Sequence, residues 1–586
     1  MNINWRVRIK NPAFWVSIAI AIVTPILAYF GLTAQDMTSW GAIWDVIVQA
    51  VSNPYVLLTV AVSVYNAVID PTSTGVTDSS RALQYNAPNK DVYKRQSYDR
   101  PITASGKIYG VKFPLASYSS APAGERTEAA VGLTAAASTD ETAAANDFDL
   151  EPCFMFTRVN GHLTSDGEFV ETAIEGDPAF SVDGSNGDVY VRWSTRFFKY
   201  IITDTHEEIQ ITDIYRPNEG WCPYGIFVAP DGRLKRYAYI AAYEMGYNSD
   251  GLAASISGVP TSHNTYTNRN AATAGLSHNT QLTEIRKKGN QYCGMTTKEV
   301  AFLQDMFCVE FATRNSQSIM QGCVNLNFQI HPTVAETGAT RVIVSNANAS
   351  KFPVGCTVSV GTASSSGSTD RNLASMNSIV NRKRVLSQEA YDDSNTALNL
   401  DVGDDTFDTT TECYISTMPW YTGMTDGVKG TSGSYKSNTN GYYPMKYRGV
   451  ENLYGNVYTI MSDVIISNYK AYICYDCTKF TTSVSYNYIE VGYSLSSSGG
   501  YVKEMGSDAA HPSVRLPITV GGSASTYYCD YYYISGGANH ELLFGGSLHS
   551  GSYAGLFLWN GSSAVSNASW TIGSRLSVSG RSGEAA

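Results

Sequence analysis

The chain changes character near Asp91, and this change constrains its fold more than any other feature. The residues before Asp91 contain two long uncharged, largely apolar runs, whereas those after it are rich in Tyr, Ser and Gly. Apolar runs of this length suit a bilayer, while short alternating segments between turns suit β-sheets. We therefore expect two unrelated parts, a two-helix transmembrane segment at residues 1–90 followed by β-rich modules.

The first part contains two candidate membrane spans. Three basic residues precede an uncharged run at residues 11–35, whose apolar centre has about the 20 residues needed to cross hydrocarbon. A second uncharged run at residues 46–69 contains Pro54 and is the weaker candidate. The connection between the runs has no Lys or Arg, so the positive-inside bias places both ends of this part in the cytoplasm.

Composition alone also suits a generic two-span anchor, but the ends of this part are more specific. The opening MNINWRVRIKNPAFW and the tail DPTSTGVTDSSRALQYNAP resemble phage holins of the phi LC3 type. The resemblance implies subunits that accumulate in the host inner membrane and open lesions that release or activate a lysin, without any catalytic residue. The matching positions are Trp5, Arg6, Arg8, Asp70, Pro71, Gly75 and Asp78.

Residues 91–96 join the two parts. Val92 to Gln96 read VYKRQ, which resembles a translated adaptor remnant of a sequence assembly; a natural basic linker is the alternative. A cytoplasmic tail would leave the remaining chain inside the cell, whereas its composition suits an exterior surface. We therefore expect the two parts to be separate genes in nature, which sequencing reads across these codons would test.

The charge pattern of the long part argues against nucleic-acid binding. The net charge is −11, and the densest basic runs are the triplets Arg286–Lys288 and Arg382–Arg384. A nucleic-acid partner needs a larger basic footprint. The pair Cys474 and Cys477 has no second CxxC, so we expect ordinary buried thiols and no metal site.

Changes in composition and residue pattern divide the long part into modules. Residues 97–216 alternate apolar and polar residues between turns and predict a β-rich N-terminal module. Residues 325–420 are rich in Ser, Thr and Asp and predict an inserted β module. Its acidic stretch at residues 401–408 is compatible with structural calcium, but it lacks the ligand spacing of a calcium loop, which favours a solvated loop. Residues 295–322 read as a helix with Thr296 or Thr297 at its N-terminus and Glu299 in the first turn.

Four segments at residues 217–324 and 421–586 resemble an α+β C-type-lectin-like domain of the formylglycine-generating-enzyme group. In the order of that family they are Thr296–Glu299, Gly455–Tyr458, Phe544–Leu548 and Gly573–Arg575. Glycines permit close backbone approach and positive φ, and arginine offers a rigid fork of donors, so we assign these motif residues to the scaffold. They are Gly455, Asn456, Gly545, Gly546, Ser547, Gly573 and Arg575.

The same resemblance argues against catalysis and against a cofactor. The oxidase branch of that family uses a Cys pair after the Gly-Gly-Ser strand, whereas here Cys529 is the last cysteine and none follows Gly546. No His pair has helical spacing, and no phosphate loop or nucleophile elbow is present. We expect a non-enzymatic protein; a degenerate sulfatase-modifying enzyme is the alternative.

The C-terminal segment has the composition of a binding surface. Tyrosine offers large contact area at low entropic cost, while Ser, Asn and Gly adapt their hydrogen bonds. With the fold resemblance, this implies a variable protein of a diversity-generating retroelement, which serves in phages as a tail-tip receptor binder. The expected ligand-binding residues are Tyr527, Tyr528, Asp530, Tyr531, Tyr532, Tyr533, Leu548, His549, Ser550, Ser552, Tyr553, Leu558, Ser562, Ser563, Ser569 and Thr571.

The partners and location follow from this hypothesis. We expect the long part to lie in the virion tail, to contact phage tail proteins and to bind a bacterial surface protein or glycan. The first part would lie in the host inner membrane. A homo-oligomer is compatible with the sequence, and a Tyr-rich sheet edge with solvated loops is the alternative explanation of the C-terminal composition.

Overall fold

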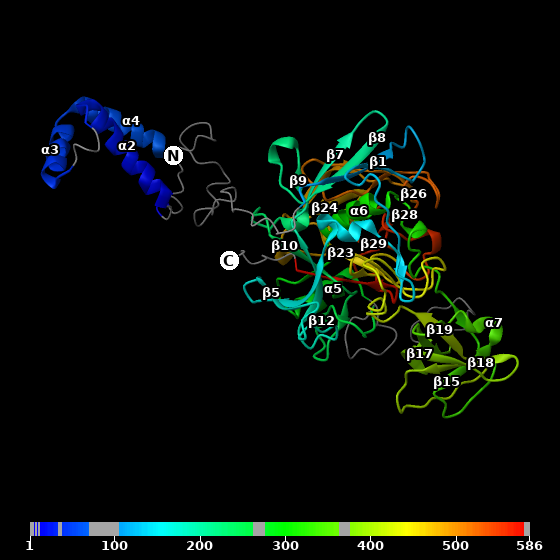
Figure 1. Cartoon of the computed structure of the whole chain (residues 1–586). Helices are drawn as coiled ribbons and strands as arrows, with labels where there is room; N and C mark the ends of the chain where they lie inside the picture. The colour runs from blue at the N-terminus through cyan, green and yellow to red at the C-terminus, as the bar shows by residue number, and fades with distance from the viewer. Residues whose placement is uncertain are drawn as a thin grey trace. The chain divides into compact units, whose positions relative to one another are not determined.

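The computed structural model describes residues 5, 9, 12–32, 38–68, 105–261, 276–362 and 376–578 (Figure 1). The chain forms two compact units, Met1–Ser97 and Tyr98–Ala586. The first is helical and the second is rich in β-strands. The junction predicted at residues 91–96 lies outside the described residues, as do all of the holin-like positions except Trp5.

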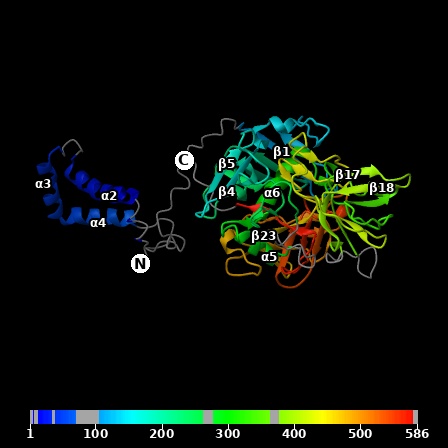
Figure 2. The same ribbon diagram turned by 90° about the horizontal axis from the view of Figure 1, so that it is seen from below.

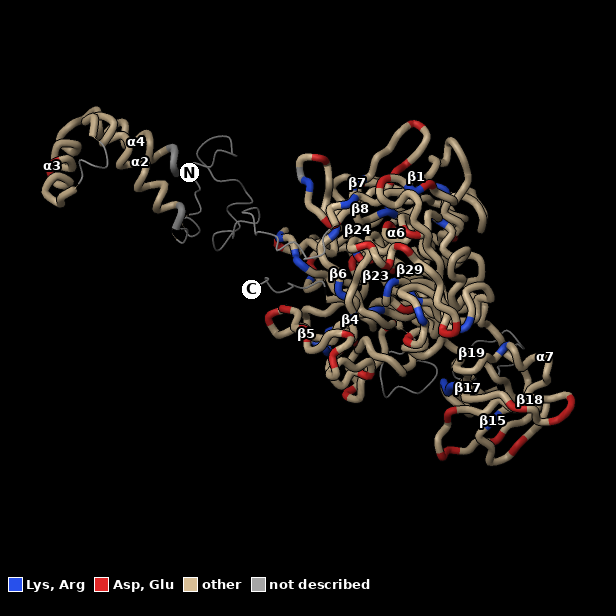
Figure 3. The backbone as a smooth tube through the Cα atoms, in the orientation of Figure 1, with Lys and Arg blue, Asp and Glu red and all other residues tan. Residues whose placement is uncertain are grey.

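The described residues of the first unit include the helices α2 (Pro12–Phe30), α3 (Trp40–Val51) and α4 (Pro54–Val68). They carry no Lys or Arg, and Asp45 is the one acidic residue among them (Figure 3). Helices α2 and α4 pack against each other. Near their contact, the Asn53 side-chain amide donates to the Tyr29 hydroxyl at 2.9 Å.

The second predicted span is a bent pair of helices. Asn53 stops α3 from continuing straight into α4 because its Oδ1 accepts from the Tyr55 amide at 3.0 Å, and Pro54 favours a helix start. In the described part of the chain, no single helix has both the length and the apolarity to cross a membrane. Trp40–Val51 and Pro54–Tyr65 meet those requirements together, with a 95° bend between them. The run predicted to be the weaker span is therefore two helices joined by a bend next to Pro54.

The helices of the first unit expose large apolar side chains on several faces. Trp40 is 86% exposed, and Trp15, Ile20, Trp44 and Leu58 are all more than half exposed. Exposed apolar surface of this kind marks contact with a membrane or with other protein copies. The unit therefore has the surface of a membrane-associated helical segment.

Two sheets dominate the N-terminal half of the second unit. One has the order β2-β1-β8-β7-β9 and comprises β1 (Ile108–Pro114), β2 (Glu125–Glu128), β7 (Phe197–Ile202), β8 (His206–Thr212) and β9 (Cys222–Pro223). The other has the order β13-β32-β10-β6-β4-β5 and comprises β4 (Thr157–Leu163), β5 (Phe169–Ile174), β6 (Asp188–Ser194), β10 (Tyr237–Ala241), β13 (Cys293–Gly294) and β32 (Leu576–Ser577).

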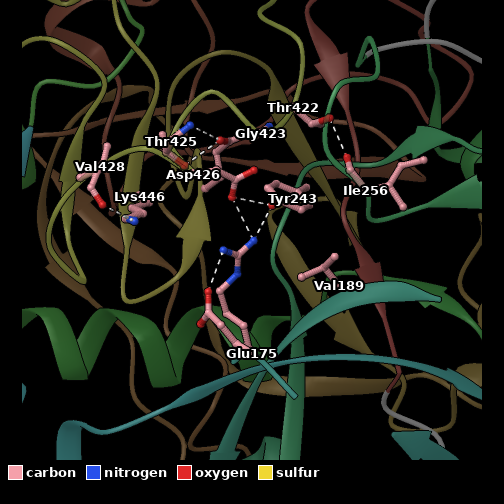
Figure 4. Close-up of polar contacts among 12 residues, drawn as sticks. Glu175, Val189, Tyr243, Ile256, Thr422, Gly423, Thr425, Asp426, Val428 and Lys446 are labelled. Atoms are coloured by element: carbon pink, nitrogen blue, oxygen red, sulfur yellow. Dashed lines mark hydrogen bonds and ion pairs between the residues drawn. The ribbon is translucent and has the colours of Figure 1, made fainter. Parts of the chain in front are cut away.

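The boundary expected at residue 216 does not separate these sheets. Strand β6 pairs with β10, so residues from both sides of the boundary share one sheet. A polar network joins them further: Arg158 pairs with Asp426 at 3.0 Å and with Glu175 at 3.3 Å, and the Tyr243 hydroxyl donates to Asp426 at 2.6 Å (Figure 4). The predicted N-terminal module and the following segment therefore share one sheet. Local composition does not reveal such long-range strand pairing.

Helix α6 (Thr297–Phe311) lies in the main core and is buried along its whole length. The Glu299 carboxylate accepts from the Thr296 amide at 2.6 Å, and Val300, Leu303, Phe307 and Phe311 pack in the core, as predicted. The helix is shorter than the predicted 295–322 because Ala312 turns the backbone into the left-handed region, with φ 51°.

The segment predicted to be inserted forms a sheet from its own residues, in the order β14-β19-β16-β17-β18-β15. Strands β17 and β18 pair antiparallel (Figure 2). Buried apolar residues such as Phe352, Val358 and Ile415 give the sheet a core separate from the main one. Its elements are β14 (Gln329–Ile330), β15 (Arg341–Ser345), α7 (Asn346–Ala349), β16 (Thr357–Gly361), β17 (Val380–Ala390), β18 (Asn395–Leu400) and β19 (Tyr414–Met418).

The C-terminal sheet has the order β25-β24-β23-β29-β30-β28-β26-β27, and β31 pairs with β23. Helix α5 (His278–Arg286) and the short pairs β11–β12 (Gly246–Tyr247, Ala253–Ala254) and β20–β21–β22 with β3 complete the unit. The bounds of the sheet are β23 (Tyr458–Ser467), β24 (Lys470–Ile473), β25 (Ile489–Ser494), β26 (Gly500–Met505), β27 (Pro517–Val520), β28 (Tyr531–Ile534), β29 (His540–Phe544), β30 (Trp559–Gly561) and β31 (Ile572–Gly573). Those of the small sheet are β3 (Ser138–Thr139), β20 (Gly433–Ser434), β21 (Met445–Tyr447) and β22 (Val450–Glu451).

Candidate ligand-binding face

Strand β28 presents alternate tyrosines to opposite sides of the C-terminal sheet. Tyr532 is buried in the main core, whereas Tyr531 and Tyr533 are half-buried. Successive side chains of a strand point to opposite faces, so Tyr531 and Tyr533 share one face while Tyr532 takes the other. Their rings lie 4.6 Å apart, centroid to centroid.

Two more tyrosines complete a surface cluster, which we call the tyrosine face: Tyr501, Tyr531, Tyr533 and Tyr553. Tyr501 of β26 is the register partner of Tyr531, and their rings meet edge-on at 5.4 Å. Tyr553 is 40% exposed, and the centroid of its ring lies 4.6 Å from that of Tyr531 and 5.6 Å from that of Tyr501. Four partly exposed rings in mutual contact form a rigid apolar surface with hydroxyl groups on it, suited to contact recognition.

The prediction missed Tyr501. It lies upstream of the Tyr-rich segment, and only the pairing of Gly500 and Tyr501 with Tyr532 and Tyr531 brings it to the face. Its one sequence signal is the alternation of β26, which does not specify a partner strand.

Several predicted ligand-binding residues belong to the interior and do not form part of an exposed face. The ring of Tyr528, for example, packs edge-on against Phe557 at 5.0 Å and lies 4.3 Å from the Arg314 guanidinium carbon. Composition predicted exposure for these residues, but strand alternation and the approach of neighbouring loops bury them. They are Tyr528, Asp530, Tyr532, Leu548, Ser550, Leu558 and Thr571.

The remaining predicted residues are partly or fully exposed. Ser552 touches the tyrosine face through its hydroxyl, 3.2 Å from that of Tyr501. The centroid of the Tyr527 ring lies 5.7 Å from the Lys503 ammonium nitrogen. The ring centroids of His549 and Trp570 lie 6.1 Å apart. The serines Ser562, Ser563 and Ser569 are half-buried.

The residues assigned to the scaffold occupy constrained backbone positions. Gly455 has φ +79°, and a Cβ there would lie 2.7 Å from the Cys323 carbonyl oxygen, so only glycine fits. Gly545 and Gly546 also have positive φ, and a Cβ at Gly573 would lie 2.5 Å from a methyl group of Val457. The Ser547 amide donates to the Ser550 hydroxyl at 2.9 Å.

Asn456 and Arg575 meet around a buried carboxyl group. The Asn456 side-chain amide donates to Glu244 at 2.6 Å, and that of Asn452 does so at 3.1 Å. Arg575 donates to the backbone carbonyls of Ala241, Glu451 and Asn452. Burial raises the pKa of Glu244 to about 8, although Arg575 and the two amides act in the opposite direction.

This carboxyl group should make stability depend on pH. Between pH 4.5 and about 8 the unfolded chain ionises Glu244 while the folded chain keeps it protonated, so the free energy of unfolding falls as the pH rises. Glutamine does not ionise, so the free energy of unfolding of Glu244→Gln should fall less across this window than that of the unchanged chain. We expect the difference between the two falls to be on the order of 3 kcal/mol. Urea titrations of both proteins from pH 4.5 to 8.5 measure the difference, and parallel pH profiles would show that Glu244 is ionised in the fold.

The surroundings of Cys529 and of the acidic stretch at residues 401–408 are defined in the structure. Burial raises the pKa of Cys529 to about 12, which disfavours the nucleophilic thiolate. In the described residues, no group of three or more His, Cys, Asp or Glu side chains is arranged to hold a metal ion. Within the acidic stretch at 401–408, Asp401 pairs with Arg384 at 2.7 Å and Asp408 accepts from the Gly338 amide at 2.8 Å.

Comparison with known proteins informs the first unit. Residues 3–89 match the family model described as bacteriophage holin. No curated protein matches the chain. The match covers α2, α3 and α4, the helices with exposed apolar surface, and ends before the β-rich unit. The N-terminal segment of this chain is therefore holin-like.

Proposed function

We propose that the β-rich unit is a non-catalytic phage receptor-binding protein that contacts a bacterial surface molecule through the tyrosine face. The observation that carries the proposal is the contact of Tyr501, Tyr531, Tyr533 and Tyr553 on one side of the C-terminal sheet. Aromatic anchors of this kind dominate contact recognition. The four C-type-lectin-like segments support a scaffold of the type found in variable proteins of diversity-generating retroelements, placed at the virion tail.

For the first unit we propose a separate role as a holin that permeabilises the host inner membrane. Its support is the family match over residues 3–89, together with helices that expose large apolar side chains. The two roles belong to different locations, which favours two genes joined at residues 91–96.

Alanine substitutions in the tyrosine face, with a control on β28, test the binding proposal. Tyr531→Ala and Tyr553→Ala should change the free energy of unfolding little, by about 0.5 kcal/mol, and weaken cell adsorption by about 2 kcal/mol or thirtyfold each. Tyr532→Ala is the matched control from the same strand, and we expect it to destabilise the fold by about 3–5 kcal/mol because its ring is in the core. Thermal melting and adsorption to a panel of bacterial strains measure the two effects.

Two outcomes contradict the proposal. If Tyr531→Ala and Tyr553→Ala melt early, these rings serve the core. If the unchanged chain adsorbs to strains of the panel and both variants adsorb equally well, the binding surface lies elsewhere.

A further inference from the structure

A cavity of about 300 Å³ lies at the edge of the tyrosine face. Ser552 belongs to both, since it lines the cavity and its hydroxyl lies 3.2 Å from that of Tyr501. The volume is at the lower end of the range for small-molecule sites. Its polar lining comprises Asn315, Gln317, Ser318, Gln321, Asp530 and Ser552.

Asp530 is the most unusual residue of this lining because it is only 1% exposed. Its Oδ2 accepts from the Phe557 amide at 2.7 Å, and this is the one hydrogen bond of the side chain among the described residues. A buried carboxyl group needs more partners than this to offset its desolvation. Burial raises the pKa of Asp530 well above its usual value, which favours a neutral carboxyl group that can both donate and accept.

Gly555 makes room for this carboxyl group. Its φ is +146°, and a Cβ there would come within 2.3 Å of Asp530 Oδ1. The loop that carries Gly555 is held by Gln317, whose side-chain amide donates to the Gly551 and Ala554 carbonyls at 3.0 and 2.6 Å. The cavity wall is thus fixed by its own hydrogen bonds.

Gln321 adds a second side chain with free hydrogen-bonding capacity. Among the described residues its side chain makes no hydrogen bond, and it lines the cavity with Asp530. An amide and a carboxyl group that each donate and accept suit a ligand whose neighbouring groups also do both. Vicinal hydroxyl groups on a sugar ring have this property, and the apolar face of such a ring packs on aromatic surfaces.

We propose that this cavity is the subsite for one sugar ring of a bacterial surface glycan, whose adjoining residues pack on the tyrosine face. The inference rests on the proposed receptor-binding function and names its ligand class. In the complex, Asp530 and Gln321 hydrogen-bond to ring hydroxyls, and the Ser552–Tyr501 contact connects the subsite to the four rings.

Sugar titrations of the full chain, purified in detergent, test this proposal. The probes are glucose, galactose, rhamnose and N-acetylglucosamine, each followed by ligand-observed NMR. We expect at least one to bind, and Asp530→Ala and Gln321→Leu each to weaken it about tenfold, the loss of one hydrogen bond to a buried group. Asp204→Ala, at an exposed turn, is the matched control and should bind as the unchanged chain does.

The same proteins are assayed for adsorption to bacterial strains and to protease-treated cells. The sugar subsite is overturned, and receptor binding left intact, if no sugar binds, Tyr553→Ala loses adsorption and Asp530→Ala adsorbs fully. Adsorption abolished by the protease, without sugar binding, points instead to a protein receptor. Absence of adsorption to every strain contradicts the proposed function itself. If Asp530→Ala fails to fold, Gln321→Leu decides, because the Gln321 side chain makes no hydrogen bond to the described residues.

Discussion

Replacing Glu310 by leucine should destabilise the β-rich unit by about 3–5 kcal/mol, since it removes the buried bidentate partner of a buried guanidinium and leaves that charge only the partly exposed Asp149, 3.2 Å from its Nη1. Glu310 is 0% exposed and Arg448 is 1% exposed at their side chains. The pair is bidentate, with Arg448 Nε 2.7 Å and Nη2 2.8 Å from the two carboxylate oxygens. Tyr447 and Asn146 also donate to Glu310, at 2.9 and 2.6 Å.

The location of this pair explains why its loss should affect the whole unit. Glu310 is in the last turn of α6, Arg448 follows β21, and the Arg448 Nη1 donates to the Phe154 carbonyl at 3.0 Å. Burial works against the charge of Arg448, but Glu310, Tyr447 and Asp149 together outweigh it and raise the pKa of the guanidinium. Three segments far apart in sequence therefore meet at one charge pair.

Urea unfolding of Glu310→Leu, Arg448→Met and the double variant measures this effect. The double variant should lose less than the sum of the singles, because removing both charges leaves neither unpaired. Glu490→Gln is the matched control: its ion pair with Lys470 is as short, 2.6 Å, but both side chains are 43% exposed, so we expect a much smaller loss of stability than for Glu310→Leu. Equal costs for Glu310→Leu and Glu490→Gln would contradict the prediction.

Local patterns anticipated the elements whose determinants are close in sequence. The start of α6 follows from Thr296 and Glu299, and the uncharged run at residues 11–35 contains α2. The bend between α3 and α4 is also local, since Asn53-Pro54 is a helix-start signal, but the apolar composition of the run outweighed it in the prediction.

The candidate site depended on information that composition does not carry. Tyr531, Tyr532 and Tyr533 are chemically equivalent in the sequence, and only the position of the core assigns Tyr532 to the interior. The pairing of Tyr501 with Tyr531 requires the register of β26 and β28, which are separated by a further strand along the chain. Residue type thus predicted a tyrosine-rich surface but not which tyrosines lie on it.

Expression of residues 1–90 alone in bacteria should collapse the membrane potential and stop growth. The segment matches the bacteriophage holin family model over residues 3–89, and α2, α3 and α4 carry a single charged residue, Asp45. Exposed apolar side chains on α2, α3 and α4 gain stability when they leave water for hydrocarbon. Accumulation of such subunits in the inner membrane is expected to open it to ions and then to larger solutes.

A charge in the middle of α2 should abolish this effect. Ile20 is 59% exposed, so lysine fits there sterically, but a lysine at the centre of a membrane helix costs about 2.5–3.5 kcal/mol on insertion scales. Ile20→Lys should therefore leave the membrane potential intact, while Ile20→Val, the matched control, should permeabilise as the unchanged segment does. A potential-sensitive dye reports the loss of membrane potential, and a membrane-impermeant DNA stain reports the later entry of larger solutes.

Residues 97–586, expressed in parallel, separate the activities of the two parts. Because permeabilisation depends on apolar helices that this fragment lacks, we expect it to leave the membrane potential unchanged. Intact potential and dye exclusion at high levels of residues 1–90 would show that the helices serve as an anchor without lytic activity. Permeabilisation by residues 97–586 would place the membrane activity in the β-rich unit and remove the reason for assigning the two parts to different locations.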